Sequence, residues 1–445
     1  MPSIAVDMKK TTQVRFYQGY AVSRLFWNSF KCHSGILVLP CGAGKTLIGI
    51  SVIAALKKRS IIFCQSNLAV NQWRNQLLQF TTIKEGSISR FSARHKEEWN
   101  SGADVIITSY PMFSSSKLSE DSRAMMEQIK KREWGLLLLD EVHLAPAKTF
   151  RKVTNHITSH VKLGLTATMV REDDLIEDLP HLVGPVLHEV DIFTLRMHKF
   201  ISPVECVELH CAMPDVFMSA YNSSENREQN LLYALNPNKI RVVWSLVKQH
   251  QEKKHRIMVF CDNLICLEAY TAIINNKIDG NTPDEKRSKI FKQFRQNPGE
   301  CILISQVGDQ SIDLPEADVV IQVALMHGGR MQEGQRIGRI QRYQEGKATG
   351  FFYSLVSEGT REVQYAEKRR TFLEDHGYII NTLKGDSYKR YLDGLEILNE
   401  EHNQKEMIVL LRNELDNKEQ DKANRNQQPQ NKRKREPEPQ KEISK

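Results

Sequence analysis

Residues 34–59, SGILVLPCGAGKTLIGISVIAALKKR, decide the fold class of this chain of 445 residues. The run 34–40 is apolar and typical of a strand, whereas residues 47–59 carry apolar side chains at helical spacing and close on basic residues, which favour a helix C-terminus. The glycine-rich stretch GAGKT, residues 42–46, lies between them. Strand, tight turn and helix in this order predict the first βα unit of a parallel sheet.

The alternation of strands and helices continues along most of the chain. The apolar runs that predict further strands are residues 61–65, 103–109, 135–141 and 162–167 in the first half, and 256–262, 300–306, 318–323 and 350–356 in the second. Helical patterns separate them. Buried strands alternating with helices predict α/β architecture, with two doubly wound parallel sheets that carry helices on both faces.

Length and composition shifts divide the chain into four parts. We expect a first α/β domain over residues 1–195, a small connecting element over 196–236, where the sequence is polar and less periodic, and a second α/β domain over 237–400. Residues 401–445 are rich in Asn, Gln, Lys and Glu, and we expect a mostly disordered basic and polar tail. A terminal helix can extend into this segment, and beyond Asp416 we expect disorder.

Composition excludes several classes of protein. The net charge is +8, which permits a polyanionic partner without demonstrating one. The longest aliphatic run, Leu136–Leu139, is far shorter than the roughly 20 residues that span a bilayer, so we expect no membrane partner. No secretory signal is visible, and the eight cysteines show no CxxC pair. We therefore expect an intracellular, soluble protein with free thiols and no zinc site.

The stretch Gly42-Ala43-Gly44-Lys45-Thr46 has the composition of a phosphate-binding loop. Small residues let backbone N–H groups close around an anion at a helix N-terminus, and Lys45 adds a positive charge for the β- and γ-phosphates. The Thr46 hydroxyl is a ligand for Mg²⁺. An ordinary tight turn is the alternative, and the strand–helix setting favours the nucleotide site.

Two adjacent carboxylates, Asp140 and Glu141, follow the buried run LLLL. Because parallel sheets bind ligands at the carboxyl ends of their strands, this pair is expected beside the phosphate loop. In that position Asp140 can hold Mg²⁺ with its ligands, and Glu141 can orient or deprotonate an attacking water. An acidic strand end that caps the next helix is the alternative, and it is weaker because two motifs coincide on one sheet.

A basic segment in the second half, QEGQRIGRIQR, predicts a helix with a catalytic face. Gln335, Gly338, Arg339 and Arg342 share that face, and the two arginines lie one turn apart. Guanidinium groups placed in this way stabilise charge on a phosphoryl group during its transfer. The alternative is a solvated basic helix face.

These segments, in this order, resemble superfamily-two helicases, and within them the XPB-type DNA helicases and translocases of the TFIIH complex with their archaeal relatives. The similar segments are LPCGAGKTLIG, WGLLLLDEVHLAPAKTFRKV, KLGLTATMVREDDLIEDLPHLVGP, VGDQSIDLPEADVVIQ, HGGRMQEGQRIGRIQR and FFYSLVSEGTREVQYAEKRRTFL. They extend from about residue 14 to residue 380. The resemblance implies two tandem RecA-like domains with ATP bound in the cleft between them and a small thumb-like element at 196–236.

The resemblance also implies residue roles in that cleft. Gln18 resembles the glutamine that contacts adenine, and Asp313 the residue that contacts the ribose. The side chains expected to act on the phosphates and Mg²⁺ are Lys45, Thr46, Asp140 and Glu141 from the first domain and Gln335, Arg339 and Arg342 from the second. Closure of the two domains would then build the catalytic site.

DNA contacts are implied at two places. Arg171, Glu172 and Asp173 resemble the RED element that acts on the duplex, although a charged loop capping the next helix is the alternative. Thr108 and Ser109 fall near segments that track the DNA strand, where hydroxyls would contact phosphates without reading bases. Trp73 and Arg74 fall near them as well, and for Trp73 a structural role is an equal alternative.

The resulting hypothesis is an ATP- and Mg²⁺-dependent 3′→5′ DNA helicase or double-stranded DNA translocase in transcription initiation and nucleotide excision repair. It implies sequence-independent DNA binding, other TFIIH subunits as partners and a location in the nucleus of a eukaryotic cell. The basic run Lys432–Arg435 suits a localisation signal or a nucleic-acid patch. Two alternatives stay open: a stand-alone archaeal-like or viral helicase outside TFIIH, and a non-catalytic assembly paralogue.

Overall fold

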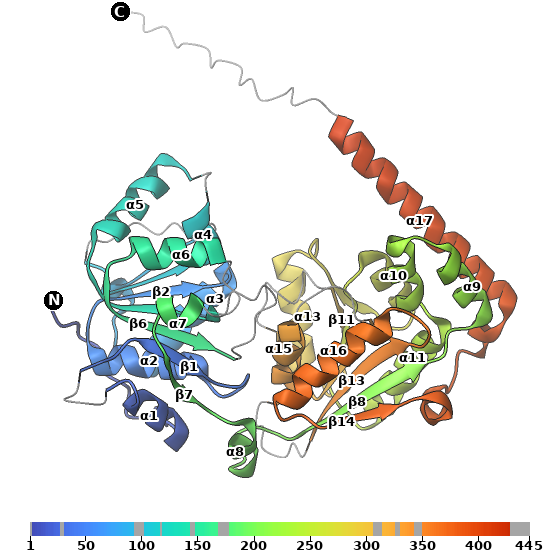
Figure 1. Cartoon of the computed structure of the whole chain (residues 1–445), viewed down its shortest axis with the longest axis horizontal. Coiled ribbons are helices and arrows are strands. Elements are labelled where there is room, and N and C mark those ends of the chain that lie inside the picture. Colours follow the sequence, from blue (N-terminus) through green and yellow to red (C-terminus); the bar gives the residue numbers. More distant parts are fainter. Residues whose placement is uncertain are drawn as a thin grey trace, which may run out of the picture.

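The chain folds into two α/β lobes joined in sequence order, with a long C-terminal helix on the outside of the second lobe (Figure 1). The computed structural model describes residues 2–26, 31–92, 102–115, 118–142, 147–167, 178–305, 314–324, 330–341 and 349–427. Each lobe contains one seven-stranded sheet, and every strand pairing in the two sheets is parallel. The α/β prediction with two doubly wound parallel sheets is therefore confirmed.

The first lobe is built around the sheet ordered β3-β4-β2-β5-β6-β1-β7. Its strands are β1 (Gly35–Val38), β2 (Ser60–Cys64), β3 (Ile88–Phe91), β4 (Val105–Ser109), β5 (Trp134–Leu139), β6 (Ser159–Thr166) and β7 (Val186–Glu189). Its helices are α1 (Phe16–Ser23), α2 (Lys45–Leu56), α3 (Asn67–Phe80), α4 (Tyr110–Ser114), α5 (Glu120–Lys131), α6 (Ala147–His156), α7 (Asp178–Leu182) and α8 (Ile192–Met197), with a 3₁₀ turn at Glu85–Ser87.

The second lobe repeats that strand order as β10-β11-β9-β12-β13-β8-β14. Its strands are β8 (Val204–Cys211), β9 (Ile257–Phe260), β10 (Asn276–Ile278), β11 (Cys301–Ile304), β12 (Val319–Gln322), β13 (Gly350–Ser357) and β14 (Ile380–Leu383). Its helices are α9 (Asp215–Ser223), α10 (Asn226–Ala234), α11 (Pro237–Glu252), α12 (Leu264–Tyr270), α13 (Asp284–Gln296), α15 (Arg330–Ile340), α16 (Glu362–Asp375) and α17 (Glu401–Gln427), with 3₁₀ turns at Gly385–Tyr391 and Glu396–Asn399.

Strand β5 shows why the core strands are continuous apolar runs. All six of its residues are buried. Leu136 and Leu138 join the cluster beneath α2 and α3, whereas Leu137 and Leu139 join the cluster beneath α5 and α6. A strand covered by helices on both faces has no solvent side, so every position is apolar.

The connecting element expected at 196–236 is corrected by strand β8. This strand lies inside the second sheet, where it pairs with β13 over eight residues and with β14 on its other side. The polar residues of β8 made the segment look like a surface connection. Glu208 is nevertheless buried, and its carboxylate accepts hydrogen bonds from His210 at 2.7 Å and from Arg370 at 3.0 Å. Charged residues that are paired in this way can occupy a core strand, which a hydropathy pattern does not predict.

The tail prediction is corrected in part by helix α17, which continues to Gln427 rather than ending near Asp416. Ile408, Leu411 and Leu415, spaced three and four residues apart, are buried in the core of the second lobe. Packing of this stripe stabilises a helix whose composition is otherwise polar. In the part of the chain that the structure describes, no helix is long and apolar enough to cross a membrane.

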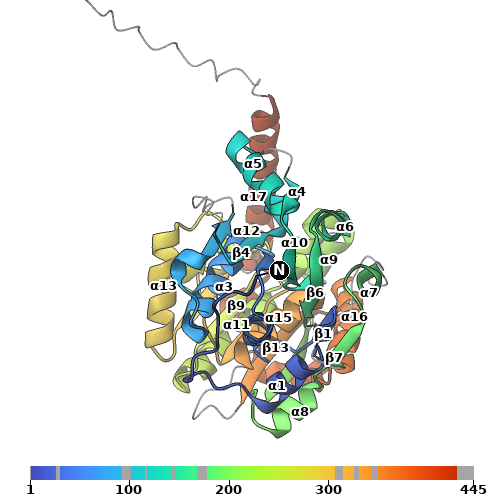
Figure 2. The same cartoon turned by 90° about the vertical axis from the view of Figure 1, so that its left-hand side faces the viewer.

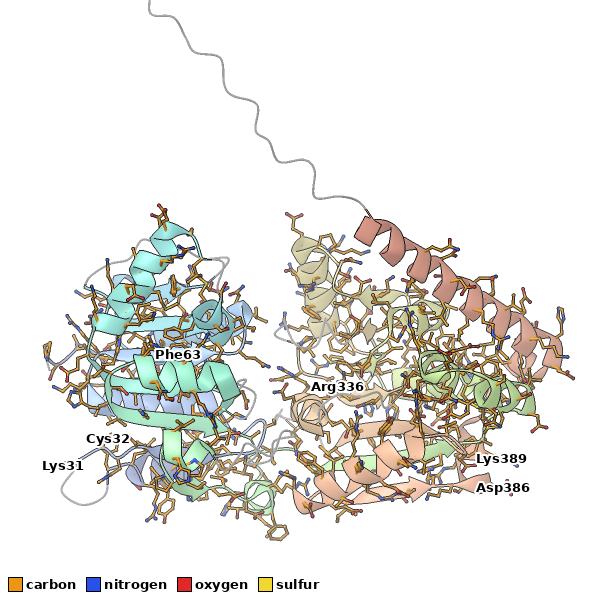
Figure 3. The ribbon with its side chains drawn as sticks, turned by 45° about the horizontal axis from the view of Figure 1, so that its top comes forward. Lys31, Cys32, Phe63, Arg336, Asp386 and Lys389 are labelled. Atoms are coloured by element: carbon orange, nitrogen blue, oxygen red, sulfur yellow. The ribbon has the colours of Figure 1, made fainter. Side chains whose placement is uncertain are left out.

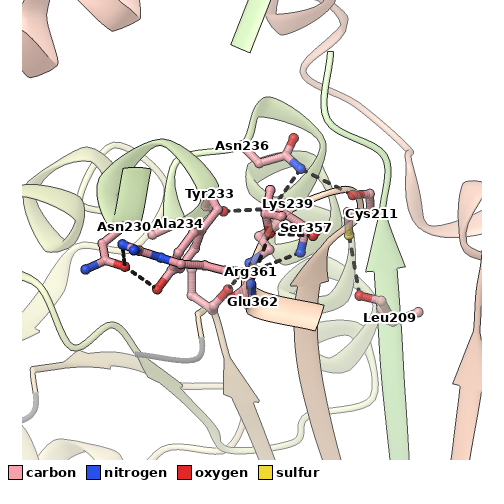
Figure 4. A network of polar contacts seen from close by, with 12 residues as sticks. Leu209, Cys211, Asn230, Tyr233, Ala234, Asn236, Lys239, Ser357, Arg361 and Glu362 are labelled. Atoms are coloured by element: carbon pink, nitrogen blue, oxygen red, sulfur yellow. Dashed lines mark hydrogen bonds and ion pairs between the residues drawn. The ribbon is translucent and has the colours of Figure 1, made fainter. Parts of the chain in front are cut away.

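A buried ion pair occupies the carboxyl edge of the second sheet (Figure 4). The Nζ atom of Lys239 lies 2.6 Å from Oε2 of Glu362 and donates to the Val323 carbonyl at 3.0 Å, and both charged side chains have no solvent exposure. The backbone N–H of Ser357 donates to the same carboxylate oxygen. The network joins the ends of β12 and β13, which correspond in sheet order to β5 and β6 of the first lobe.

We predict that Lys239→Met lowers the free energy of unfolding of the second lobe by about 3–5 kcal/mol, because it leaves the Glu362 charge buried without a cation. The double variant K239M/E362Q should recover at least half of that loss, since the buried charge is removed with its partner. Urea denaturation measures both. Lys131→Met on the surface of α5 is the control, and a K239M midpoint equal to that of the wild type would contradict the assignment.

Candidate nucleotide-binding cleft

The phosphate loop leaves β1 at the carboxyl edge of the first sheet and turns directly into α2. Gly42 and Gly44 have φ values of +83° and +79°, in the left-handed region that favours glycine. A Cβ atom on Gly44 would lie 2.5 Å from Nε2 of Gln18, so a side chain there is excluded for a second reason. Lys45 and Thr46 begin α2, where unpaired backbone N–H groups favour an anion.

Helix α1 holds this loop from behind. The Tyr17 hydroxyl donates to the Ala43 carbonyl at 2.6 Å, and Nε2 of Gln18 donates to the same oxygen at 3.0 Å. Oε1 of Gln18 accepts from the backbone N–H of Arg15 at 3.0 Å, which completes the N-terminal cap of α1. Gln18, which we expected to contact a base, lines the cleft and also positions the phosphate loop.

The carboxylate pair lies beside the loop, as its place after β5 predicts. Nζ of Lys45 is 3.1 Å from Oε1 of Glu141. Burial alone would lower the pKa of Lys45, but the nearby charges of Glu141 and Asp140 raise it above its ordinary value, so the ammonium group stays charged. Burial and the charge of Glu141 raise the pKa of Asp140, whereas its hydrogen bond from Trp73 and the charge of Lys45 act in the opposite direction.

Asp140 and Glu141 are fixed by their surroundings. Nε1 of Trp73, a buried residue of α3, donates to Oδ2 of Asp140 at 2.7 Å, and the Tyr110 hydroxyl donates to the Asp140 carbonyl at 3.0 Å. Glu141 has a φ of +46°, a left-handed conformation that costs a residue with a Cβ atom on the order of 1–3 kcal/mol. Such strain persists where the surrounding structure imposes it, and it is frequent at functional sites.

Helix α15 contributes the opposite wall, and buried ion pairs anchor its inner face. Nη2 of Arg336 is 2.8 Å from Oδ1 of Asp262, and its guanidinium lies 4.3 Å from the centre of the Phe260 ring. One turn earlier, Glu333 pairs with Arg369 of α16 at 2.9 Å. Figure 3 places Arg336 on the side of the second lobe that faces the first. These anchors leave the other face of α15 for the cleft.

The two lobes meet in a cleft of about 580 Å³. The residues of both motifs line it: Gly42, Ala43, Gly44, Lys45, Thr46, Asp140 and Glu141 from the first lobe, with Gln335, Gly338 and Arg339 from the second. The lobes approach one another closely at Gly338, where a Cβ atom would lie only 2.5 Å from Cβ of Cys41. The glycine therefore lets α15 reach the phosphate loop.

The donor set fits a nucleotide with Mg²⁺. Gly42, Gly44 and the start of α2 form a cradle for phosphates, and the Thr46 hydroxyl and the Asp140 carboxylate are oxygen ligands beside it. Mg²⁺ is commonly held by one or two carboxylates together with substrate phosphates and water. Within the described ranges, no three His, Cys, Asp or Glu side chains gather into a metal site made of protein groups alone.

Thr108 and Ser109, which we expected near a DNA strand, are buried at the end of β4. Thr108 is fully buried and its hydroxyl donates to the Phe91 carbonyl at 2.8 Å, while the buried Ser109 hydroxyl accepts from the Met112 N–H as the N-cap of α4. Arg74 forms an ion pair with Glu85. In this conformation both hydroxyls bond within the fold, and contact of Thr108 and Ser109 with a DNA strand stays a prediction.

Five predicted residues lie outside the described residues: Arg171, Glu172, Asp173, Asp313 and Arg342. The structure also shows two positioning residues. Trp73, for which a structural role was one of the two expectations, donates to Asp140. Arg336 was not predicted, because it stands in a basic run and nothing in that run indicates that its side chain points toward the core.

Sequence models of known protein families match most of this chain. The sequence model of the ERCC3/RAD25/XPB C-terminal helicase family matches residues 195–439, more than half of the chain. This chain belongs to that family. The model of the type III restriction enzyme res subunit matches residues 11–171.

Curated relatives agree with the family. The chain is 43% identical over 428 residues to the general transcription and DNA repair factor IIH helicase/translocase subunit XPB of Schizosaccharomyces pombe, an alignment that covers 93% of this chain and 52% of the relative. It is 41% identical over 388 residues to the XPB/SSL2 subunit of Saccharomyces cerevisiae, covering 86% of this chain and 46% of that protein. The chain thus spans about half the length of these relatives.

Solved structures support the fold. Dbp5 of S. cerevisiae bound to RNA and ADP BeF3 has a TM-score of 0.60 at 14% identity, covering 86% of this chain and 95% of that chain. The Hef helicase domain of Pyrococcus furiosus has a TM-score of 0.53 at 12% identity, covering 80% and 98%. Both likenesses show a shared arrangement of two tandem RecA-like domains.

We predict that Gly338→Ala raises the KM for ATP and lowers kcat by about tenfold or more, because the new methyl group would collide with Cys41 and hold α15 away from the phosphate loop. Gly334→Ala in the same helix is the matched control, since a Cβ there meets nothing within 4 Å. Steady-state ATPase assays with both variants measure the difference. Equal activity of the two variants would contradict the closure that we describe.

Proposed function

We propose that the chain is an ATP-driven DNA helicase or double-stranded DNA translocase that opens DNA with 3′→5′ polarity. The single observation that carries the proposal is the cleft in which Lys45, Asp140 and Glu141 of one lobe face Gln335 and Arg339 of the other. Because the site is divided between lobes, a ligand held by both couples its own chemistry to their relative movement. Family membership and the relatives' names support DNA as the substrate.

Each residue of the cleft has a chemical task in this proposal. ATP with Mg²⁺, when bound, supplies the phosphoryl group whose transfer to water releases free energy. Lys45 holds a permanent positive charge at the loop, which suits the β- and γ-phosphates, while Thr46 and Asp140 would hold Mg²⁺. Glu141 orients the attacking water and accepts its proton, and its ion pair with Lys45 keeps its carboxylate directed into the cleft.

The second lobe completes the site in the proposal. Gln335 and Arg339 reach it from α15, and the guanidinium of Arg339 stabilises negative charge that develops on the transferred group. Arg342 and Asp313 keep their expected roles as a second arginine finger and a ribose contact. Buried pairs on the inner face of α15 fix the helix, so Gln335 and Arg339 are carried by a rigid element that is in place before a ligand arrives.

On the DNA side, the proposal includes sequence-independent binding through phosphates, with Arg171, Glu172 and Asp173 acting on the duplex. Participation in transcription initiation and nucleotide excision repair with other TFIIH subunits, in a nucleus, follows the relatives and is part of the proposal. A stand-alone helicase outside TFIIH remains the second form of the same activity. A non-catalytic paralogue is disfavoured because the sequence retains Lys45, Glu141 and Arg342, which a paralogue without activity would be expected to lose.

We predict that double-stranded DNA stimulates ATP hydrolysis by the purified chain, and that Lys45→Ala and Glu141→Gln each lower the turnover by about 10²-fold or more, since each removes a charge that acts on the transferred phosphoryl group or on the attacking water. Lys131→Ala, an exposed lysine of α5, is the matched control and should retain full turnover. Phosphate release assays with and without DNA measure these rates.

The outcomes separate the alternatives. Hydrolysis that depends on Lys45 and Glu141 supports the motor. Absence of DNA-stimulated hydrolysis in the wild-type chain, or unchanged turnover in both variants, would contradict it and favour the assembly paralogue.

A further inference from the structure

The segment between α8 and β8, residues 198–203, crosses from the first lobe to the second. We call it the connector. Figures 1 and 2 show α8 beside α1 at the same end of the molecule, next to this crossing. The connector contacts the elements that build both walls of the nucleotide cleft.

Phe200 is the centre of its contact with the first lobe. Its ring centre lies 5.5 Å from that of Phe16, 5.2 Å from that of Tyr17 and 5.8 Å from that of His198. The guanidinium of Arg15 lies 4.9 Å from the centre of the same ring, and Nη1 of Arg15 donates to the Phe200 carbonyl at 2.9 Å. We call these five side chains the hinge clamp.

The hinge clamp reaches the phosphate loop through Tyr17. This tyrosine is buried, and its hydroxyl donates to the Ala43 carbonyl at 2.6 Å, directly behind the loop that carries Lys45. Burial raises the pKa of Tyr17, so the hydroxyl keeps its proton as a donor. Arg15 lines the cleft itself. Phe200 therefore packs against two residues that contact or line the nucleotide cleft.

The other end of the connector holds the second lobe. The Ser202 N–H donates to the Gln341 carbonyl at 2.7 Å, and Oε1 of Gln341 accepts from the Tyr378 hydroxyl at 3.0 Å. Gln341 is fully buried and directly follows α15, the helix that presents Gln335 and Arg339. Ile201 is buried between these contacts. One short segment thus joins the back of the phosphate loop to the end of α15.

We propose that Phe200 is a positioning residue of the nucleotide site, and that the hinge clamp transmits occupancy of the cleft from α1 to α15. The inference rests on the proposed function and names a residue outside the motifs that define it. Two lobes joined by a loose chain would lose orientational freedom whenever they closed on a ligand. A clamp that fixes the connector on both sides reduces that loss, and a ligand then binds a site that is closer to its closed geometry.

Phe16 contributes to the proposal in a particular way. Its side chain is 56% exposed, although its ring centre lies 4.8 Å from that of His198 and its ring also packs against Phe200. The aromatic cluster is therefore half open to solvent rather than part of a sealed core. Such a contact can loosen and re-form without unfolding either lobe, which a transmitting element requires.

The test compares Phe200→Ala with Phe200→Trp, which keeps an aromatic ring, and with Phe193→Ala, an exposed phenylalanine of α8 that serves as the matched control. We measure the Kd for ADP by isothermal titration calorimetry, together with KM and kcat of DNA-stimulated ATP hydrolysis and the Tm of each full-length chain. F200A is expected to weaken ADP binding about fivefold and to raise KM by a similar factor, which is the size of one cation–π contact, because the hydrogen bond from Arg15 to the backbone carbonyl of residue 200 is retained. F200W should recover to within about twofold, and F193A should match the wild type.

A double variant shows whether Arg15 and Phe200 act together. R15A/F200A should bind ADP no more than about twofold more weakly than R15A alone, because the pair forms one unit. A purely structural role would lower the Tm of F200A and leave the Kd of the folded chain unchanged, and that result would overturn the inference. Fully additive losses would overturn it as well. A wild-type chain that binds no ADP would overturn the proposed function and this inference together, whereas wild-type binding with an unaffected F200A would overturn the inference alone.

Discussion

The structure depends on one close approach, that of the phosphate loop of the first lobe and helix α15 of the second. The two backbones come so near that only a glycine fits at position 338, because a Cβ atom would lie 2.5 Å from that of Cys41. Everything else in the site serves this approach. Tyr17 and Gln18 hold the loop, Trp73 holds Asp140, and the Arg336–Asp262 and Glu333–Arg369 pairs hold α15. A ligand between the lobes therefore meets groups that are already oriented on both sides.

The two sheets have the same strand order, and among the described residues the phosphate cradle lies at the edge of the first. At the corresponding edge of the second sheet, Lys239 and Glu362 satisfy one another and Asn236 bonds the carbonyls after β8 (Figure 4). The ion pair fixes the ends of β12 and β13, and Asn236 fixes the end of β8. In the part of the chain that the structure describes, the cleft at the junction is lined by the phosphate loop and carboxylate pair of the first lobe and by Gln335 and Arg339 of the second.

Local chemistry made the core of this site predictable. GAGKT between a strand and a helix, and LLLLDE ending a buried strand, each fix backbone direction as well as side-chain type, so their meeting at one sheet edge follows from parallel topology. The features that were not predicted depend on side-chain partners that the local sequence does not show. Strand β8 was not predicted because its Glu208 is polar, and in the fold this carboxylate bonds His210 and Arg370. The hydroxyl of Thr108 donates to the Phe91 carbonyl. Arg370 is 162 residues from Glu208, and Phe91 is 17 residues from Thr108, so local sequence does not reveal these two contacts.

Hydrogen exchange of backbone amides with and without ADP and beryllium fluoride tests the central claim most directly, namely that both lobes form one nucleotide site. The account predicts slower exchange in two separate segments, the phosphate loop with the start of α2 at residues 41–47 and helix α15 at residues 333–341, because one ligand binds between them. Slower exchange confined to residues 41–47, with α15 unchanged at saturating nucleotide, would contradict the account.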